Sequence, residues 1–123
     1  MSKKSILIIE DSPYLAESLV DMINIRGFNA MMSPTGREGV ITAIENKPDL
    51  ILLDIRLPDI DGYEVYRRIR KDKWGAKAKI LVLTASESIE NISKNIDLPT
   101  DRILFKPNWS VKDLLDRIAE ELK

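Results

Sequence analysis

The sequence predicts an α/β fold in which a doubly wound sheet of five parallel strands is built from five βα units. Short, continuous apolar runs at 6–9, 50–53 and 80–83 are typical of strands buried on both faces. Segments with helical periodicity separate these runs. Strict alternation of strands and helices implies right-handed crossovers, with helices on both faces of a parallel sheet.

The first βα unit has the clearest boundary signals. Its helix is predicted to start with Ser12 as N-cap and Pro13 in the first turn, and to end at Gly27. A weaker apolar run at 28–32 predicts the second strand. The buried face of the first helix is expected to carry Leu15, Leu19, Met22 and Ile23.

The later helices are predicted from their caps and apolar stripes. Thr35 to Glu38 and Asp61 to Glu64 have capping-box spacing. Ser110 is expected to cap the last helix, and the run at 103–105 is expected to form the fifth strand. The expected apolar faces are Val40, Ile41 and Ile44 in the second helix, Val65 and Ile69 in the third, Ile89, Ile92 and Ile96 in the fourth, and Val111, Leu114, Leu115, Ile118 and Leu122 in the fifth.

Length and composition narrow the class of protein. The 123 residues fit one domain, 1–123, and 19 Lys plus Arg against 20 Asp plus Glu leave a net charge of -1. The sequence has no Cys and no His, which excludes disulfides, thiol catalysis, an imidazole relay and metal sites built from those residues. The apolar run at 6–9 is too short for a signal peptide or a membrane span, so a cytoplasmic protein without membrane association is expected.

Reactive side chains follow four of the five predicted strands. Glu10 and Asp11 follow the first, Asp54 the third, Thr84 the fourth and Lys106 the fifth. Carboxyl ends of parallel strands meet at one edge, where three carboxylates and one ammonium leave a formal charge of about -2. An all-oxygen site of this kind suits Mg²⁺ and a phosphoryl donor. Asp54 could then act as nucleophile, Lys106 as counter-charge and Thr84 as hydrogen-bond donor.

These motifs together resemble the receiver domain of two-component response regulators, and the resemblance covers essentially the whole chain. It rests on Glu10-Asp11, Leu52-Leu53-Asp54 with Leu57-Pro58 and Asp61-Gly62, Leu83-Thr84-Ala85, and Phe105-Lys106-Pro107. The resemblance implies the flavodoxin-like strand order 2-1-3-4-5, which sets the first and third strands side by side.

The resemblance also implies a metal site. Asp54 would accept a phosphoryl group from a phosphohistidine, forming an aspartyl phosphate. Mg²⁺ would be held by Asp11, by Asp54, by the backbone carbonyl of Arg56 and, through water, by Glu10.

Three further residues take roles toward the phosphoryl group by the same resemblance. Thr84 would reorient to hydrogen-bond it, with help from the N–H of Ala85. Lys106 would pair with Asp54 before phosphorylation and with the phosphoryl group afterwards. The Lys106–Pro107 bond is expected to be cis, as it often is in this family.

The implied function is a phosphorylation-dependent signalling module rather than an enzyme, apart from its own phosphorylation and slow dephosphorylation. The expected partners are a sensor histidine kinase or phosphotransfer protein and a downstream protein target or output domain. A homodimer formed on phosphorylation through the face from the fourth to the fifth helix is a further candidate. The basic stretch at 67–79 is expected to be a solvated helix end rather than a nucleic-acid surface.

One departure from the family keeps a second function open. Many receivers carry Tyr or Phe three residues before the strand-five lysine, where this chain has Ile103. Phosphorylation would survive that change, whereas the usual aromatic readout would be affected. The alternatives are an adaptor that keeps the fold without the switch and, more weakly, a Mg²⁺-dependent phosphatase or a flavin carrier.

Overall fold

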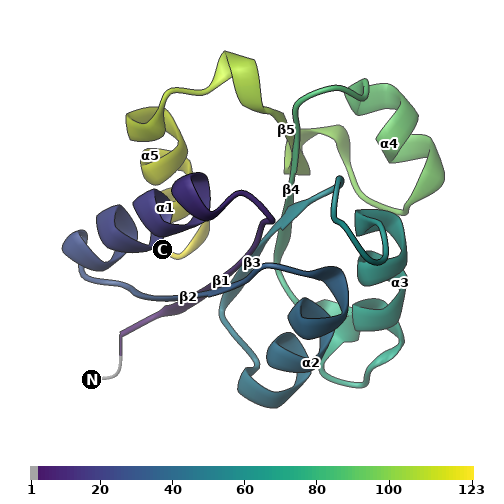
Figure 1. Cartoon of the computed structure of the whole chain (residues 1–123), viewed down its shortest axis with the longest axis horizontal. Helices are drawn as coiled ribbons and strands as arrows, with labels where there is room; N and C mark the ends of the chain where they lie inside the picture. Colours follow the sequence, from purple (N-terminus) through teal and green to yellow (C-terminus); the bar gives the residue numbers. More distant parts are fainter. Residues whose placement is uncertain (1–2) are drawn as a thin grey trace.

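A computed structural model, which describes residues 3–123, contains one five-stranded parallel sheet in the order β2-β1-β3-β4-β5 (Figure 1). Every neighbouring pair of strands is parallel, so all the carboxyl ends lie at one edge. The predicted fold class and strand order are confirmed. The strands are β1 (Ser5–Ile9), β2 (Asn29–Ser33), β3 (Leu50–Asp54), β4 (Ile80–Thr84) and β5 (Ile103–Phe105).

Five α-helices cover the two faces of the sheet. In Figure 1, α1 and α5 lie on one face and α2, α3 and α4 on the other. No helix among residues 3–123 is both long and apolar enough to cross a membrane. The helices are α1 (Pro13–Ile25), α2 (Gly36–Asn46), α3 (Gly62–Lys71), α4 (Ile89–Asn95) and α5 (Val111–Glu121), with 3₁₀ turns at Gly75–Lys77, Thr100–Arg102 and Lys106–Asn108.

The sheet separates two apolar cores, and β1 contributes to both by alternation. Leu7 and Ile9 face the core beneath α2, α3 and α4, whereas Ile6 and Ile8 face the core beneath α1 and α5. All four side chains are fully buried. Burial of each stabilises the fold by about 1.5–3 kcal/mol. This explains why the central strands are continuous apolar runs rather than alternating ones.

Three residues that were predicted to lie on buried helix faces are exposed. Met22, Ile41 and Val111 point largely to solvent, and Ile41 is 57% exposed. In α2, small residues take the sheet-facing positions instead of Ile41, because the helix approaches β1 so closely that a Cβ on Gly39 would lie 2.7 Å from Ile9 Cδ1. A stripe drawn from large apolar residues alone therefore misplaces the buried face.

The element boundaries follow the predictions, apart from one cap and one strand start. Ser12 occupies the N-cap position of α1, but its side chain makes no capping hydrogen bond. The second strand begins one residue later than predicted, because the Phe28 N–H still bonds back to Ile23 of the first helix. Gly27, with φ of 95°, follows the end of α1 as expected. The side chains of Thr35, Asp61 and Ser110 accept the predicted hydrogen bonds from the N–H groups of Glu38, Glu64 and Asp113.

Candidate functional site

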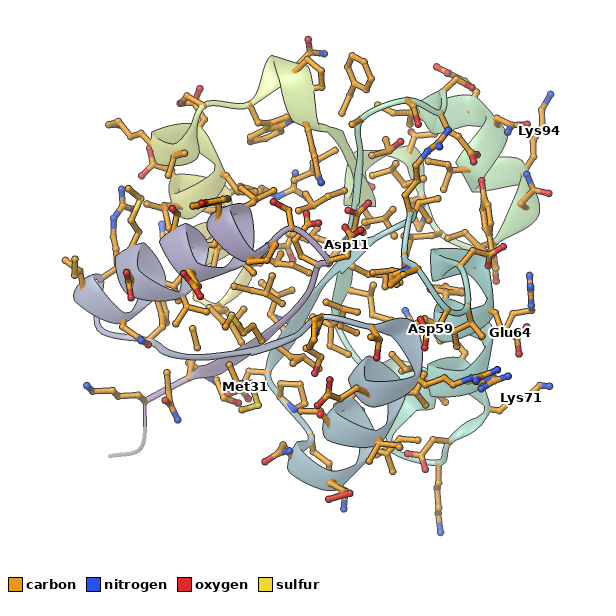
Figure 2. All side chains as sticks on the ribbon, in the orientation of Figure 1. Asp11, Met31, Asp59, Glu64, Lys71 and Lys94 are labelled. Atoms are coloured by element: carbon orange, nitrogen blue, oxygen red, sulfur yellow. The ribbon has the colours of Figure 1, made fainter. Side chains whose placement is uncertain are left out.

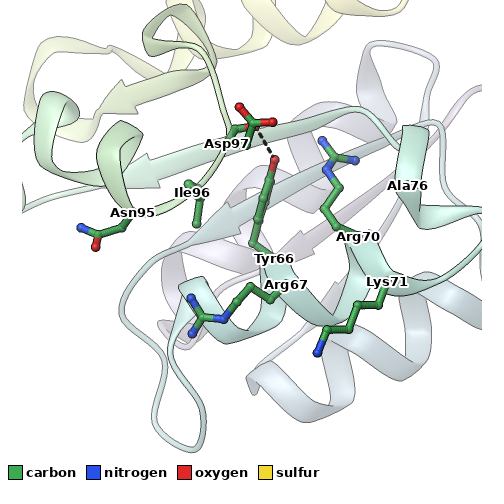
Figure 3. Close-up of a pocket in the computed structure, with 8 residues that line it drawn as sticks. All are labelled: Tyr66, Arg67, Arg70, Lys71, Ala76, Asn95, Ile96 and Asp97. Carbon is green, nitrogen blue, oxygen red and sulfur yellow. Dashed lines mark hydrogen bonds between the residues drawn. The ribbon is translucent and has the colours of Figure 1, made fainter.

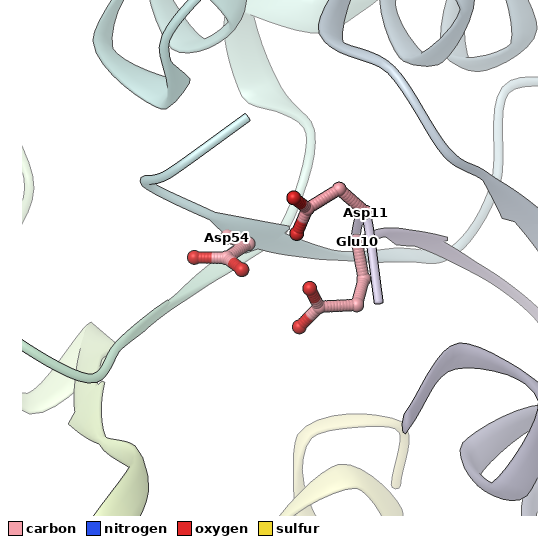
Figure 4. Close-up of side chains that lie close together, drawn as sticks. All are labelled: Glu10, Asp11 and Asp54. Atoms are coloured by element: carbon pink, nitrogen blue, oxygen red, sulfur yellow. The ribbon is translucent and has the colours of Figure 1, made fainter. Parts of the chain in front are cut away.

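Three carboxylates meet at the carboxyl edge of the sheet, as Figure 4 shows. Glu10 directly follows β1 and is only 3% exposed, and Asp54 is the last residue of β3 and 5% exposed. Asp11 lies beside them at the exposed start of the β1–α1 loop. Each of the three offers an oxygen within 4.8 Å of the others. The order of β1 next to β3 therefore brings these acids together from distant parts of the chain.

Lys106 contributes the positive charge that pairs with two of these carboxylates. Its Nζ lies 2.7 Å from Glu10 Oε1 and 3.1 Å from Asp54 Oδ2. The residue follows β5 directly and opens the 3₁₀ turn at Lys106–Asn108. Every peptide bond of the described residues is trans, so the expected cis bond between Lys106 and Pro107 is not found. In this turn the Trp109 N–H donates to the Lys106 carbonyl.

Burial and neighbouring charged groups shift the pKa values of Asp11 and Lys106. Desolvation and the neighbouring Glu10 raise the pKa of Asp11. For Lys106, desolvation acts to lower the pKa, but the hydrogen bond to Glu10 and the charge of Asp54 outweigh it and raise the pKa. At neutral pH the ammonium is therefore held between two carboxylates, and the acids of the site exceed its single cation.

The loop after β3 fixes the backbone around Asp54. Asp54 Oδ1 accepts a 3.1 Å hydrogen bond from the Arg56 N–H, and the chain turns back so that the Gly62 N–H donates to Ile55 O at 2.8 Å. A Cβ on Gly62 would lie 2.6 Å from Ile55 Cα and 2.7 Å from the Asp54 carbonyl oxygen. Only glycine permits this close return beside the central acid.

Thr84 is positioned at the same edge but its hydroxyl is bonded elsewhere. It is the last residue of β4 and 2% exposed. Its Oγ1 accepts from the Glu87 N–H at 3.1 Å and donates to the Glu87 carbonyl at 3.2 Å. Ala85 follows at the exposed start of the loop. Ser88 caps α4.

Two side-chain contacts around Thr84 were not predicted from the sequence. The Tyr63 hydroxyl donates to the Glu87 carboxylate, and Arg56 Nε donates to Ser86 Oγ at 2.8 Å. Both join the segment after β3 to the loop after β4. Neither Tyr63 nor Glu87 ends a strand, so the strand-end pattern that identifies the acids carries no signal for them.

Ile103 lies in the core rather than at the site. It is 2% exposed and packs in the same cluster as Ile92 and Ile96 of the α4 region. Phe105, two residues later in β5, is opposite Thr84 in the strand register. An aromatic side chain is thus present in β5, but directly before the lysine.

Three arginines of the basic stretch in α3 form ion pairs or hydrogen bonds within the protein. Arg67 and Arg68 pair with Glu64, and Arg70 donates to the carbonyls of Gly75 and Ala78 at 2.9 and 2.7 Å. Arg70 also lies over the Tyr66 ring, 4.9 Å from its centroid. Tyr66, Arg67 and Arg70 line an open cavity together with residues of the α4–β5 connection (Figure 3). The Arg67 and Arg68 side chains are 51% and 43% exposed, in keeping with the expected solvated helix end.

The arrangement of these side chains suits metal binding and nucleophilic attack. A divalent ion that prefers oxygen ligands fits the donor set, because three carboxylates converge and neither His nor Cys exists in the sequence. The Asp54 carboxylate can act as an oxygen nucleophile, and Lys106 can stabilise negative charge beside it.

Comparison with known proteins gives consistent matches. The model of the response regulator receiver domain matches residues 6–119. The chain is 33% identical over 118 residues to the DNA-binding dual master transcriptional regulator RpaA of Synechocystis, covering 96% of this chain and 48% of that regulator. It is 35% identical over 113 residues to the cell cycle response regulator CtrA of Brucella ovis, covering 92% and 47%.

A solved structure supports the same relationship. A CheY-like response regulator receiver domain protein from Methanospirillum hungatei superposes with a TM-score of 0.86 at 29% identity, covering 98% of this chain and 94% of the other. The curated relatives are longer: this chain spans about half the length of RpaA and CtrA.

Proposed function

The chain belongs to the response regulator receiver domain family, and from this premise we propose that residues 1–123 form one receiver domain that accepts a phosphoryl group on Asp54. The donor would be a phosphohistidine of a partner protein. The observation that carries the proposal is the contact of Lys106 Nζ with both Asp54 and Glu10, beside the third carboxylate of Asp11. A nucleophile, its counter-charge and a set of oxygen ligands thus share one edge of the sheet.

Mg²⁺ is the proposed cofactor because the ligand set fits it. Asp11, Asp54 and the backbone carbonyl of Arg56 would hold the ion directly, and Glu10 would act through water. Mg²⁺ in proteins uses one or two carboxylates and keeps several water ligands. When bound, it supplies positive charge to the acids and to the phosphoryl oxygens.

The proposed transfer uses residues that lie at or next to the carboxyl edge of the sheet. An oxygen of Asp54 forms a bond to phosphorus while the phosphorus–nitrogen bond breaks, and the electron pair stays on the departing imidazole nitrogen. Lys106 moves its hydrogen bond from Asp54 to a phosphoryl oxygen. Thr84 turns its hydroxyl from Glu87 toward the phosphoryl group, and the Ala85 N–H adds a second donor. Positioning and charge therefore supply most of the catalysis.

The proposed readout is a two-state shift of the β4–α4 and β5 region that changes a partner-binding surface. A histidine kinase or phosphotransfer protein would deliver the phosphoryl group. RpaA, named as a DNA-binding transcriptional regulator, and CtrA, named as a cell cycle response regulator, are about twice as long as this chain, which supports an output domain downstream. A separate protein target is the other proposed recipient of the signal. We place the protein in the cytoplasm, and phosphorylation-dependent pairing of two copies is a further proposed outcome.

Intact-mass measurement tests the proposal. The protein is incubated with acetyl phosphate, with and without Mg²⁺, and compared with Asp54→Asn. Asp97→Asn is the matched control, because Asp97 is an exposed aspartate outside the site. One added phosphoryl group is expected in the wild type and in Asp97→Asn, only with Mg²⁺. Asp54→Asn is expected to gain none.

Two results would contradict the proposal. An adduct that persists in Asp54→Asn would place the phosphoacceptor elsewhere. No adduct from several donors, in a folded sample that binds Mg²⁺, would favour an adaptor that keeps the fold without phosphorylation.

A further inference from the structure

We infer that Tyr63 and Glu87 are positioning residues that hold the Thr84 hydroxyl away from Asp54 and so set the population of the active conformation. The inference rests on the function proposed above and concerns the regulation of the same site. In many receivers, an aromatic residue at the position of Ile103 is coupled to the threonine. Here a link between α3 and the β4–α4 loop would take that role.

The first step is the hydrogen bonding of Thr84. Its hydroxyl is both donor and acceptor toward the Glu87 backbone, at 3.2 and 3.1 Å. A hydroxyl has a single proton, so a Thr84 side chain that donates to a group on Asp54 gives up its donation to the Glu87 carbonyl. The position of the Glu87 backbone therefore decides whether Thr84 is free to turn.

The second step is the anchoring of Glu87. Its carboxylate accepts from the Tyr63 hydroxyl and, at 3.4 Å, from Asn91 Nδ2. The Tyr63 ring is half-buried and packs against the core beneath α3 and α4. Desolvation and the neighbouring Glu87 raise the pKa of Tyr63 to about 12, so the phenol remains a proton donor at neutral pH. Glu87 is thus tied to a rigid helix.

The third step is the lack of an aromatic alternative at position 103. Ile103 fills the core and has no polar group that could follow Thr84. The β4–α4 loop is instead tied to the segment after β3 by Tyr63–Glu87 and by Arg56–Ser86. Tyr63 holds Glu87 where its backbone N–H and carbonyl bond the Thr84 hydroxyl, and Thr84 loses these contacts when it turns. The bond therefore favours the resting state.

The test compares two Tyr→Phe substitutions in the same helix. Tyr63→Phe removes the hydroxyl that holds Glu87 and keeps the ring. Tyr66→Phe is the matched control, because the Tyr66 hydroxyl donates to the Asp97 carbonyl at 2.8 Å and has no contact with Glu87 (Figure 3). Two quantities are measured: hydrogen exchange of the Glu87 amide without ligand, and affinity for beryllium fluoride with Mg²⁺ as a mimic of the phosphoryl group.

Tyr63→Phe is expected to accelerate exchange of the Glu87 amide and to tighten beryllium fluoride binding about threefold to tenfold, the range for loss of one hydrogen bond from the resting state. Tyr66→Phe is expected to change neither quantity. Glu87→Gln keeps a carbonyl oxygen for Tyr63 and should stay near the wild type, whereas Glu87→Ala should match Tyr63→Phe. The double variant Tyr63→Phe/Glu87→Ala should add little to either single change.

Equal exchange and equal affinity in the wild type and Tyr63→Phe would overturn the inference. So would an equal change in Tyr66→Phe, since the effect would then come from general loosening of α3. If the wild type binds beryllium fluoride and Tyr63→Phe changes neither the exchange nor the affinity, only the proposed role of Tyr63 and Glu87 is refuted. A wild type that takes up neither beryllium fluoride nor a phosphoryl group refutes the proposed function, and the inference with it.

Discussion

Asp59 caps a helix that precedes it in the sequence: its Oδ1 accepts a 2.7 Å hydrogen bond from the N–H of Gly36, the first residue of α2. The other carboxylate oxygen accepts from the Arg37 N–H at 2.9 Å. Figure 2 labels Asp59 between α2 and α3. A residue of the loop after β3 thereby ties that loop to α2, and a carboxylate at a helix N-terminus is favourable.

This cap predicts a pH-dependent stability. Desolvation opposes the effect, but the N–H groups of Arg37, Ile60 and Gly36 lower the pKa of Asp59 to about 2. Because the folded-state pKa lies below the unfolded one, the stabilisation is complete above about pH 4 and is lost as the pH falls through about 2. Asp59→Ala should lower the melting temperature at pH 7, and the difference from the wild type should shrink toward pH 2. A difference that is constant with pH would refute this assignment.

Removal of the ammonium from the site should destabilise the fold. Lys106→Met leaves Glu10 and Asp54 buried without their cation, which should cost about 1–3 kcal/mol at pH 7, less than for a fully buried pair because Lys106 is partly exposed. The raised pKa of Lys106 means that its contribution is complete at pH 7 and is lost only as the pH rises through the folded-state value. Urea unfolding measures the change, and Lys71→Met, at an exposed lysine of α3, is the control. Equal loss in both variants would argue against the ion pairs.

The close return of the chain beside Asp54 should make Gly62 intolerant of a side chain. Gly62→Ala places a methyl group against the Ile55 Cα and the Asp54 carbonyl, so the backbone must shift. We expect a loss of about 1–3 kcal/mol in stability and slower phosphorylation of Asp54. Gly27→Ala is the comparison, because φ there is 95° and nothing lies within 4 Å. It should cost about 1–2 kcal/mol through backbone strain and leave phosphorylation unchanged.

An aromatic residue at position 103 should destabilise the core. Ile103→Tyr would force a larger ring and a hydroxyl into a cluster with Ile92 and Ile96, at a cost of about 1–3 kcal/mol in overpacking. Ile103→Val removes one methylene group and should cost about 0.5–1.5 kcal/mol. Denaturant unfolding compares the two variants. A tyrosine variant as stable as the wild type would mean that the core can rearrange to accept the ring.

The strands and the acid cluster could be predicted because one principle governs both. Doubly buried strands need continuous apolar runs, and residues that end parallel strands share an edge, so Asp54 and Lys106 could be placed at one edge of the sheet. Their pairing came from the family resemblance. Their chemical roles remain proposals. The strand order came from the family resemblance and is confirmed by the register of β1 with β3.

Other features depend on packing that sequence periodicity does not describe. The exposure of Ile41 follows from small residues that let α2 approach the sheet closely. The contact between Tyr63 and Glu87 joins positions 24 apart, one at the start of a helix and one in a loop. No local pattern marks such a pair, because it forms only after α3 and the β4–α4 loop have packed.

The placement of Lys106 after the last and shortest strand has a consequence for synthesis of the chain. All three carboxylates belong to the first 54 residues, whereas the lysine that balances them is 52 positions beyond Asp54. At about 5–20 residues per second, the ribosome adds that lysine about 3–10 s later. A nascent or truncated polypeptide that stops before β5 therefore has the acids without their cation.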